Sequence, residues 1–369
     1  MSTPTLDRSR ASSASVDAQI HAIRLGRLSA VLRPRHLIAV LALLVAAALA
    51  FAVNIGQGDY PLSIPQVFDV LFGGGSRLER LVVLEWRMGR TIVGLTVGLA
   101  LGLAGALTQS VSRNPLASPD ILGISQGASA AVVTVLVMGT SVAGLTVPAA
   151  LLGGGTATIA LVGGLVTAAV IYLLAWRRGI DPFRLVLVGI GINAMLTSVI
   201  TFMIVRADIN TAAQAKVWLT GSLAGQGWPQ FWPVLGGLVV AVVVLALVSH
   251  DLRATQLGDD AARALGVRLK LSQGVMLLVA VGLTAITVSA AGPIGFVAFV
   301  APQLALRLCH TSTPPLIGSA LTGATLLLLS DWVARVVLPW ELPVGIVTAA
   351  IGGPFLLHLV IQTNRKASA

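Results

Sequence analysis

Residues 87–90 read Arg-Met-Gly-Arg, and the stretch behind them, TIVGLTVGLALGLAGALTQSVS at 91–112, contains no charged side chain. It is followed at 114–120 by Asn-Pro-Leu-Ala-Ser-Pro-Asp. A helix needs about 17–25 mostly apolar residues to cross the roughly 30 Å hydrocarbon layer of a membrane. The stretch therefore predicts a membrane helix with two arginines at its entrance and a polar, proline-containing turn at its exit, which favours a solute-handling protein over a simple anchor.

The composition indicates an integral membrane protein. Of the 369 residues, 56% are hydrophobic and 10% are charged, and the mean hydropathy is +0.91, whereas a soluble domain has about 25% charged residues. We predict an all-α polytopic membrane protein with ten transmembrane helices. The expected spans are 37–55, 91–110, 121–140, 145–175, 185–205, 233–249, 271–290, 292–306, 315–330 and 342–362.

The positive charges predict the orientation of these spans. Most of the 24 Lys and Arg residues fall in the N-terminal tail and in the loops that ten alternating spans place on the same side. Because positive charge in short loops is retained in the cytoplasm, we expect a multi-pass protein of the cell membrane with both termini cytoplasmic. The net charge of +10 then reflects contact with the anionic inner leaflet, and no domain is expected that would bind nucleic acid.

Three regions are expected along the chain. Residues 1–36 are polar and basic and predict a disordered cytosolic tail, residues 37–362 the ten-helix domain, and residues 363–369 a cytosolic C-terminal tail. The single cysteine, Cys309, excludes an intrachain disulfide and a cysteine-rich metal site.

The cytosolic loop at 250–270 predicts a short amphipathic helix. Its acids favour the N-terminal end of a helix dipole, Asp259 and Arg263 are spaced for an i,i+4 pair, and Gly266 is a natural stop. Ala261, Ala264 and Leu265 would form a small apolar face for docking another protein. The residues expected to couple this loop to a partner are Leu257, Gly258, Asp259, Asp260, Ala261, Ala264, Leu265 and Gly266.

The sequence lacks the residues that several kinds of activity require. A phosphate loop needs Gly before Lys, and none of Lys216, Lys270 and Lys366 follows a glycine. The five histidines form no H-E-x-x-H motif for an intramembrane zinc protease. Ionisable groups are nearly absent from the middle of the spans, which weakens an ion-coupled carrier. The remaining interpretation is a permease that is energised by another subunit, is not itself an enzyme, and binds no cofactor or metal.

Two polar features have alternative interpretations. Asn193, Thr197 and Thr201 share one helix face, where they either line a translocation pathway or hydrogen-bond to a neighbouring helix. Arg87 and Arg90 also share a face and suit bidentate capture of carboxylates on a docking protein. The alternative is that these arginines anchor helices or pair with acids of this chain, such as Glu85 and Asp331.

At these residues the chain resembles the iron-siderophore and cobalamin permease family of type II ABC importers, the FecCD family. The match covers nearly all of residues 37–362. The motifs that carry it are EWRMGR at 85–90, NPLASPDILG at 114–123, the loop at 257–267, GPIGFV at 292–297 with Ala301-Pro302, and ELPVGIVT at 341–348. The chain departs from the family pattern at Gly89, where Pro is usual, and at Gln303, where His is usual.

The resemblance implies the type II ABC importer permease fold and a set of partners. These are a second permease subunit, an ABC ATPase that uses ATP, and an extracytoplasmic siderophore-binding protein with one Glu on each lobe. It also places Arg335 with Arg87 and Arg90 in the docking patch for that protein. WRRGIDPFRL at 176–185 and IQTNRK at 361–366 most resemble ferric-enterobactin permeases, which implies a ferric catecholate cargo.

Three alternatives remain beside this interpretation. A cobalamin or haem permease of the same family differs only in its cargo. A proton-coupled secondary carrier would lose uptake with an uncoupler, whereas a structural subunit could be deleted without loss of uptake.

Overall fold

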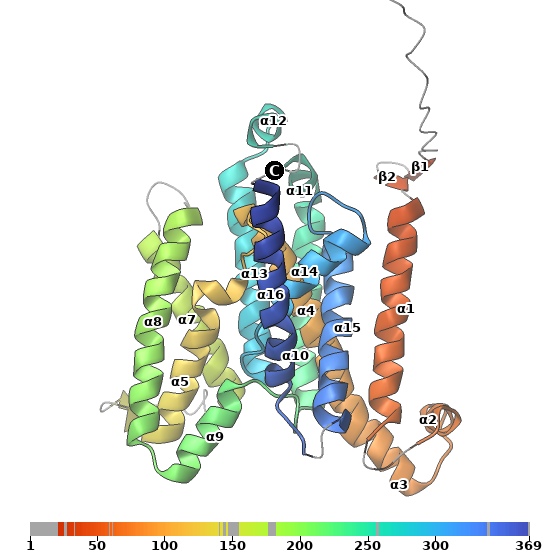
Figure 1. Ribbon diagram of the computed structural model, residues 1–369, viewed down its shortest axis with the longest axis vertical. Helices are drawn as coiled ribbons and strands as arrows, with labels where there is room; N and C mark the ends of the chain where they lie inside the picture. The colour runs from red at the N-terminus through yellow and green to blue at the C-terminus, as the bar shows by residue number, and fades with distance from the viewer. Residues whose placement is uncertain are drawn as a thin grey trace, which may run out of the picture.

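The computed structural model describes most of the chain as a bundle of long helices (Figure 1). The described residues are 21–25, 28–32, 34–58, 60, 62–139, 141–142, 145–146, 155–175, 182–255, 258–337 and 340–367.

Ten apolar helices make up the membrane part of the described chain. Eight are long and apolar enough to cross a membrane, and two, α5 and α14, are shorter. The ten are α1 (Pro34–Gly56), α4 (Met88–Ser112), α5 (Ile124–Met138), α7 (Gly155–Ala175), α8 (Pro182–Arg206), α10 (Trp228–Leu247), α13 (Leu269–Ala291), α14 (Val297–Leu308), α15 (Leu316–Trp332) and α16 (Val344–Ala367). Each overlaps one predicted span, so the all-α membrane fold is confirmed.

Helix α4 lies in the middle of the bundle and supplies much of the largest buried cluster. Its Val93, Val97, Leu101 and Leu107 pack with residues of α10, α13, α14 and α15. Glycines on its surface allow this approach, because a Cβ at Gly102 would overlap the backbone of Ser319 in α15. Small residues serve the same purpose in membrane helices generally.

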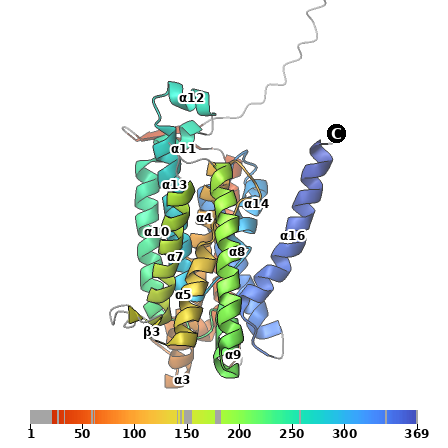
Figure 2. The ribbon, with the colours of Figure 1, turned by 90° about the vertical axis from the view of Figure 1, so that its left-hand side faces the viewer.

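Short elements cap both ends of the bundle. They are α2 (Ile64–Leu71), α3 (Arg77–Arg80), η2 (Leu81–Arg87), η3 (Pro119–Leu122), α9 (Ile209–Leu219), α11 (Ser249–Thr255), α12 (Asp259–Ala264) and η4 (Val333–Val337). Figures 1 and 2 show α11, α12 and the C-terminus at one end, with α3 and α9 at the other. The described part of the chain thus begins and ends on the same side of the bundle.

Two antiparallel hairpins add the strands. β1 (His21–Leu25) pairs with β2 (Leu28–Leu32), with His21 opposite Leu32, and β3 (Ser141–Val142) pairs with β4 (Leu145–Thr146). The first hairpin lies inside the tail that the sequence predicted to be disordered, of which residues 1–20 are outside the described residues. Short runs with β-branched Ile and Val on both sides of Gly26-Arg27 favour strand pairing there.

Two predicted span boundaries were wrong, whereas residues 147–154 of the predicted span 145–175 lie outside the described residues. The helix of the predicted span 292–306 begins at Val297, after Phe296 adopts a left-handed φ of 68°. The helical segment that contains the Arg-Met-Gly-Arg motif already begins at Arg77. Hydrophobicity marks the membrane core, whereas helix ends follow hydrogen bonding and local backbone conformation.

Candidate functional site

Arg87 is buried at the end of α1. Its side chain is 6% exposed, and it donates hydrogen bonds from Nη1 to the carbonyl oxygens of Ile55 (3.0 Å) and Gly56 (3.3 Å) and from Nη2 to that of Tyr60 (2.7 Å). The last carbonyls of a helix have no partner within it and carry partial negative charge. Arg87 therefore caps the C-terminus of α1.

Arg335, in η4, reaches the same helix end. Its Nη2 donates to the carbonyl oxygen of Asn54 (2.7 Å) and to Oδ1 of the same residue (3.2 Å). A Cβ built at Gly58 would lie 2.8 Å from Nη2 of Arg87 and 3.4 Å from Nη1 of Arg335. The two guanidinium groups thus lie close to each other beneath Gly58, although 248 positions separate them in the chain.

Asn54 is a residue that the sequence interpretation missed. It is fully buried and donates from Nδ2 to the carbonyl oxygen of Leu328 (2.6 Å) while its own carbonyl accepts from Arg335. The signal was an amide at the end of an otherwise apolar span, since a buried polar side chain needs a partner.

Arg90 has different partners from Arg87. Its Nη2 lies 2.7 Å from Oδ1 of Asp331, its Nε donates to both carboxylate oxygens at 3.2 Å, and its Nη1 pairs with Glu341. The side chains of Arg90, Asp331 and Glu341 are 12%, 1% and 48% exposed. Arg90 therefore forms the ion pair with Asp331 that the sequence left as an alternative, and Glu341 connects it to the surface.

At the opposite end, α12 presents part of the predicted coupling loop to solvent. Ala261, Ala264 and Leu265 are exposed, and Leu265 is 55% exposed. Gly266 adopts a φ of 81° and ends the helix as predicted. Leu257 lies outside the described residues, as does the side chain of Asp259.

Two contacts within this loop were not predicted. Arg263 donates a hydrogen bond to Oδ1 of Asp260 at 2.8 Å, which is an i,i+3 ion pair. Ala262, which the sequence did not single out, is fully buried and packs with Ala254, Val267 and Leu269. These contacts attach one face of α12 to the bundle and leave the opposite face outward.

The polar stripe of α8 lies on an outer face of this chain. Thr197 and Thr201 are exposed and Asn193 is half-buried. The hydroxyl of Thr197 donates to the carbonyl oxygen of Asn193 (2.8 Å), and that of Thr201 to the carbonyl oxygen of Thr197 (2.9 Å). The hydroxyl groups of Thr197 and Thr201 thus form their hydrogen bonds within α8, and the stripe to which they belong faces outward.

No group of three or more His, Cys, Asp or Glu side chains that could hold a metal ion occurs within the described residues. The candidate sites are therefore the arginines at one end of the bundle, the α12 surface at the other end and the polar face of α8.

Comparison with known proteins identifies the kind of membrane protein. The family model described as the FecCD transport family matches residues 30–362. The ferric enterobactin transport system permease protein FepG of Escherichia coli (strain K12) is 41% identical over 334 residues, which cover 90% of this chain and 98% of the relative. The iron(3+)-hydroxamate import system permease protein FhuG of Bacillus subtilis (strain 168) is 38% identical, with 90% and 98% covered.

The fold has a solved counterpart as well. The structure of a metal-chelate type ABC transporter in an inward-facing conformation aligns with a TM-score of 0.74 at 26% identity, covering 88% of this chain and 98% of that chain. A family model over nearly the whole length, relatives matched end to end and the same helical architecture agree with one another. This chain therefore belongs to the FecCD transport family, as one of its multi-pass membrane permeases.

Proposed function

We propose that this chain is the membrane permease subunit of an ABC importer that moves a ferric siderophore of the catecholate class into the cytoplasm. The observation that carries the proposal is the 41% identity to a ferric enterobactin permease over 90% of this chain. Relatives for hydroxamate and achromobactin, at 38% identity each, support iron chelates as the broader class. ATP would be hydrolysed by a separate ATPase, and a second permease subunit and an extracytoplasmic binding protein would complete the transporter.

The orientation follows from the charges and the fold together. The end with α11, α12 and the C-terminus carries the loop basic residues Arg253, Arg263, Arg268 and Lys270 (Figure 1). Under the positive-inside rule this end faces the cytoplasm. The α12 surface would then meet the ATPase, and the end with Arg87, Arg90 and Arg335 would meet the binding protein.

Of the three arginines Arg87, Arg90 and Arg335, Arg90 is the residue best placed to exchange partners. Its pair with Glu341 lies at the surface, where an ion pair contributes little, so an incoming carboxylate could replace Glu341 without uncovering a buried charge. Arg87 and Arg335 would support the same patch by holding the end of α1 in place.

Replacing Arg90 with Met together with Asp331→Leu tests this docking, because the double variant removes the cation without leaving the buried carboxylate of Asp331 unpaired. It should weaken binding of the purified binding protein to the transporter and reduce the salt dependence of that binding, because one cation that meets a carboxylate is removed. Arg77→Met, an exposed change at the same end of the bundle, is the matched control. Equal affinities for both variants and the unaltered protein at low salt would exclude docking on Arg90.

The cargo and the energy source are tested by uptake. Cells that lack this gene should fail to accumulate iron-55 supplied as a ferric catecholate, and reintroducing the gene should restore that uptake. Radiolabelled cobalamin and haem should enter at the same rate with and without the gene. Uptake should stop on ATP depletion and persist in an uncoupler as long as ATP is maintained. Loss of uptake with the uncoupler alone would indicate an ion-coupled carrier, and unchanged iron uptake after deletion would contradict the proposal.

A further inference from the structure

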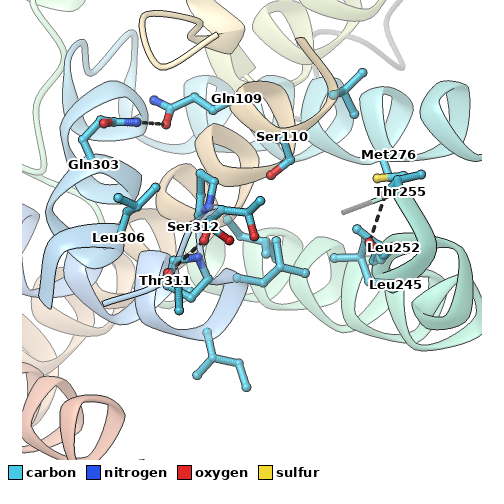
Figure 3. A pocket seen from close by; sticks show the side chains of 18 of the residues that line it. Gln109, Ser110, Leu245, Leu252, Thr255, Met276, Gln303, Leu306, Thr311 and Ser312 are labelled. Carbon is cyan, nitrogen blue, oxygen red and sulfur yellow. Dashed lines mark hydrogen bonds between the residues drawn. The ribbon is translucent and has the colours of Figure 1, made fainter. Parts of the chain in front are cut away.

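A large cavity lies at the end of the bundle that carries α11 and the C-terminus, and Gly258 of the loop before α12 is among its lining residues. Its volume is about 1840 Å³, and it is lined by α4, α10, α11, α13, α14, α15, α16 and the first turn of α1. Figure 3 shows Gln303 and Gln109, joined by a 2.7 Å hydrogen bond, on one side, with Leu245 and Leu252 on the other. Pockets for drug-sized molecules are about 300–1,000 Å³, so the cavity could contain a larger ligand.

The mouth of the cavity is basic. Arg113 follows α4, Arg253 lies in α11, Arg307 and His310 close α14, and His36 opens α1. None of the described residues that line the cavity carries a carboxylate. Nδ1 of His36 is buried without a hydrogen-bond partner among the described residues, which leaves a polar atom at the mouth for a ligand. The mouth therefore fits an anionic group.

The deeper walls are apolar. Leu99 and Leu103 of α4, Leu238 and Val242 of α10 and Leu321 of α15 line this part. At about 1.5 Å per helical residue, the separation of Leu99 from Arg113 along α4 corresponds to about 21 Å. One leaflet of a bilayer, half of about 40–45 Å with its headgroups, has nearly the same thickness. The apolar walls and the basic mouth of the cavity are thus about as far apart as the acyl chains and the headgroup of one lipid.

We propose that this cavity binds an anionic phospholipid of the leaflet on the side of the C-terminus. Its acyl chains would lie against α4, α10 and α15, and its phosphate would meet Arg113, Arg253 and the neighbouring histidines. A small soluble anion would leave the apolar walls uncovered. The N-terminal tail is basic, so it carries the same sign of charge as the mouth and would be repelled.

Two substitutions test the two parts of the site. Arg253 is exposed in α11, and Arg253→Gln removes one charge from the mouth; Arg268→Gln removes one at the same end outside the cavity. Ala246→Trp fills the apolar wall, whereas Leu247→Trp changes the adjacent residue, which does not line the cavity. All four positions are at least partly exposed, so the fold should tolerate each change.

The measurement is native mass spectrometry of the purified full chain in detergent, titrated with phosphatidylglycerol or with phosphatidylcholine of the same acyl chains. We expect phosphatidylglycerol to bind more tightly. A basic residue near anionic lipid contributes about fivefold in affinity, so Arg253→Gln should weaken phosphatidylglycerol about fivefold and leave phosphatidylcholine unchanged. Ala246→Trp should reduce the binding of both lipids, and the two control variants should match the unaltered protein.

Other results would overturn the proposal. Equal affinity for the two lipids, or identical phosphatidylglycerol binding by Arg253→Gln and Arg268→Gln, would exclude a headgroup site at this mouth. Displacement of the lipid by millimolar glycerol 3-phosphate or inorganic phosphate would identify a soluble anion as the ligand. Unchanged binding by Ala246→Trp would place the acyl chains elsewhere.

Discussion

At the scale of single residues, the ion pair between Arg90 and Asp331 has the clearest energetic consequence. Asp331 is 1% exposed and accepts three hydrogen bonds from one guanidinium group. Removing one partner of a buried ion pair leaves an uncompensated charge, which costs about 3–5 kcal/mol. Asp331→Ala should therefore lower the free energy of unfolding by about that amount, whereas Arg90→Met combined with Asp331→Leu should restore most of it.

Reversible unfolding in SDS, analysed as a double-mutant cycle, measures these differences. Glu341→Gln is the control at the exposed end of the same cluster and should cost less than about 1 kcal/mol. If Asp331→Ala also lowers the free energy of unfolding by less than about 1 kcal/mol, Arg90 and Asp331 are not coupled in the membrane.

Asp120, in the loop between α4 and α5, predicts a pH dependence. Burial raises the pKa of its carboxyl group, and hydrogen bonds from Ser125 (2.7 Å) and Ser118 (3.2 Å) only partly oppose this. The folded state therefore holds the proton more tightly than the unfolded state, in which an aspartate titrates near about 3.9. Stability is greatest below that value and declines as the pH rises through the raised pKa of the folded state.

Asp120→Asn should remove this decline, because an amide keeps the acceptor and carries no charge. We expect the variant to unfold at a higher temperature than the unaltered protein at neutral pH and at nearly the same temperature at pH 4. Thermal unfolding in detergent from pH 4 to pH 8 provides the measurement. A variant that is less stable at neutral pH would show that the ionised carboxylate is favoured in the fold.

At the scale of elements, the two faces of α12 should respond differently to substitution. Ala261 and Ala264 are exposed, whereas Ala262 is fully buried against Ala254 and Val267. Ala261→Trp and Ala264→Trp should leave membrane insertion and thermal stability intact while uncoupling ATP hydrolysis from transport. Ala262→Trp should instead destabilise the loop by about 1–3 kcal/mol, the usual cost of overpacking.

ATPase activity and uptake of the reconstituted transporter, measured beside the melting temperature, separate these effects. Normal coupled transport in both exposed variants would exclude the docking role of α12, and a stable, active Ala262→Trp protein would contradict the packing described.

At the scale of the whole molecule, α8 lies along an outer face of the bundle (Figure 2). Its outer face mixes apolar residues such as Phe202 and Val205, 54% and 78% exposed, with the stripe of half-buried Asn193 and exposed Thr197 and Thr201. If a second permease subunit covers this face, the stripe would line the pathway between the two subunits. Cysteines at the three stripe positions should then react with a water-soluble thiol reagent in at least one nucleotide state.

Cys309→Ala provides the background for this experiment, and burial raises the pKa of the native thiol, so Cys309 itself should react slowly. Leu41→Cys on the exposed side of α1 serves as the control that faces lipid. If all three stripe cysteines stay unlabelled in every state, they are packing residues.

Some features of this protein could be predicted from its sequence, and others could not. The membrane class and the ten apolar segments follow from properties that are summed over contiguous residues, and they were confirmed. The face of α12 that carries Ala262 was missed, because the helical period says which residues share a face and not which face meets the bundle.

The sequence by itself determined the membrane fold, the family and the location of the charges, since hydrophobicity, helix length and short motifs are local. Only the tertiary structure decided the partners. Arg87 and Arg90 lie three residues apart, yet one caps α1 and the other pairs with Asp331 and Glu341. The cavity with its basic mouth and apolar walls is likewise lined by eight helices. Contacts of this kind join residues as far apart as Arg335 and Asn54, which 281 positions separate, and their geometry depends on how whole helices cross.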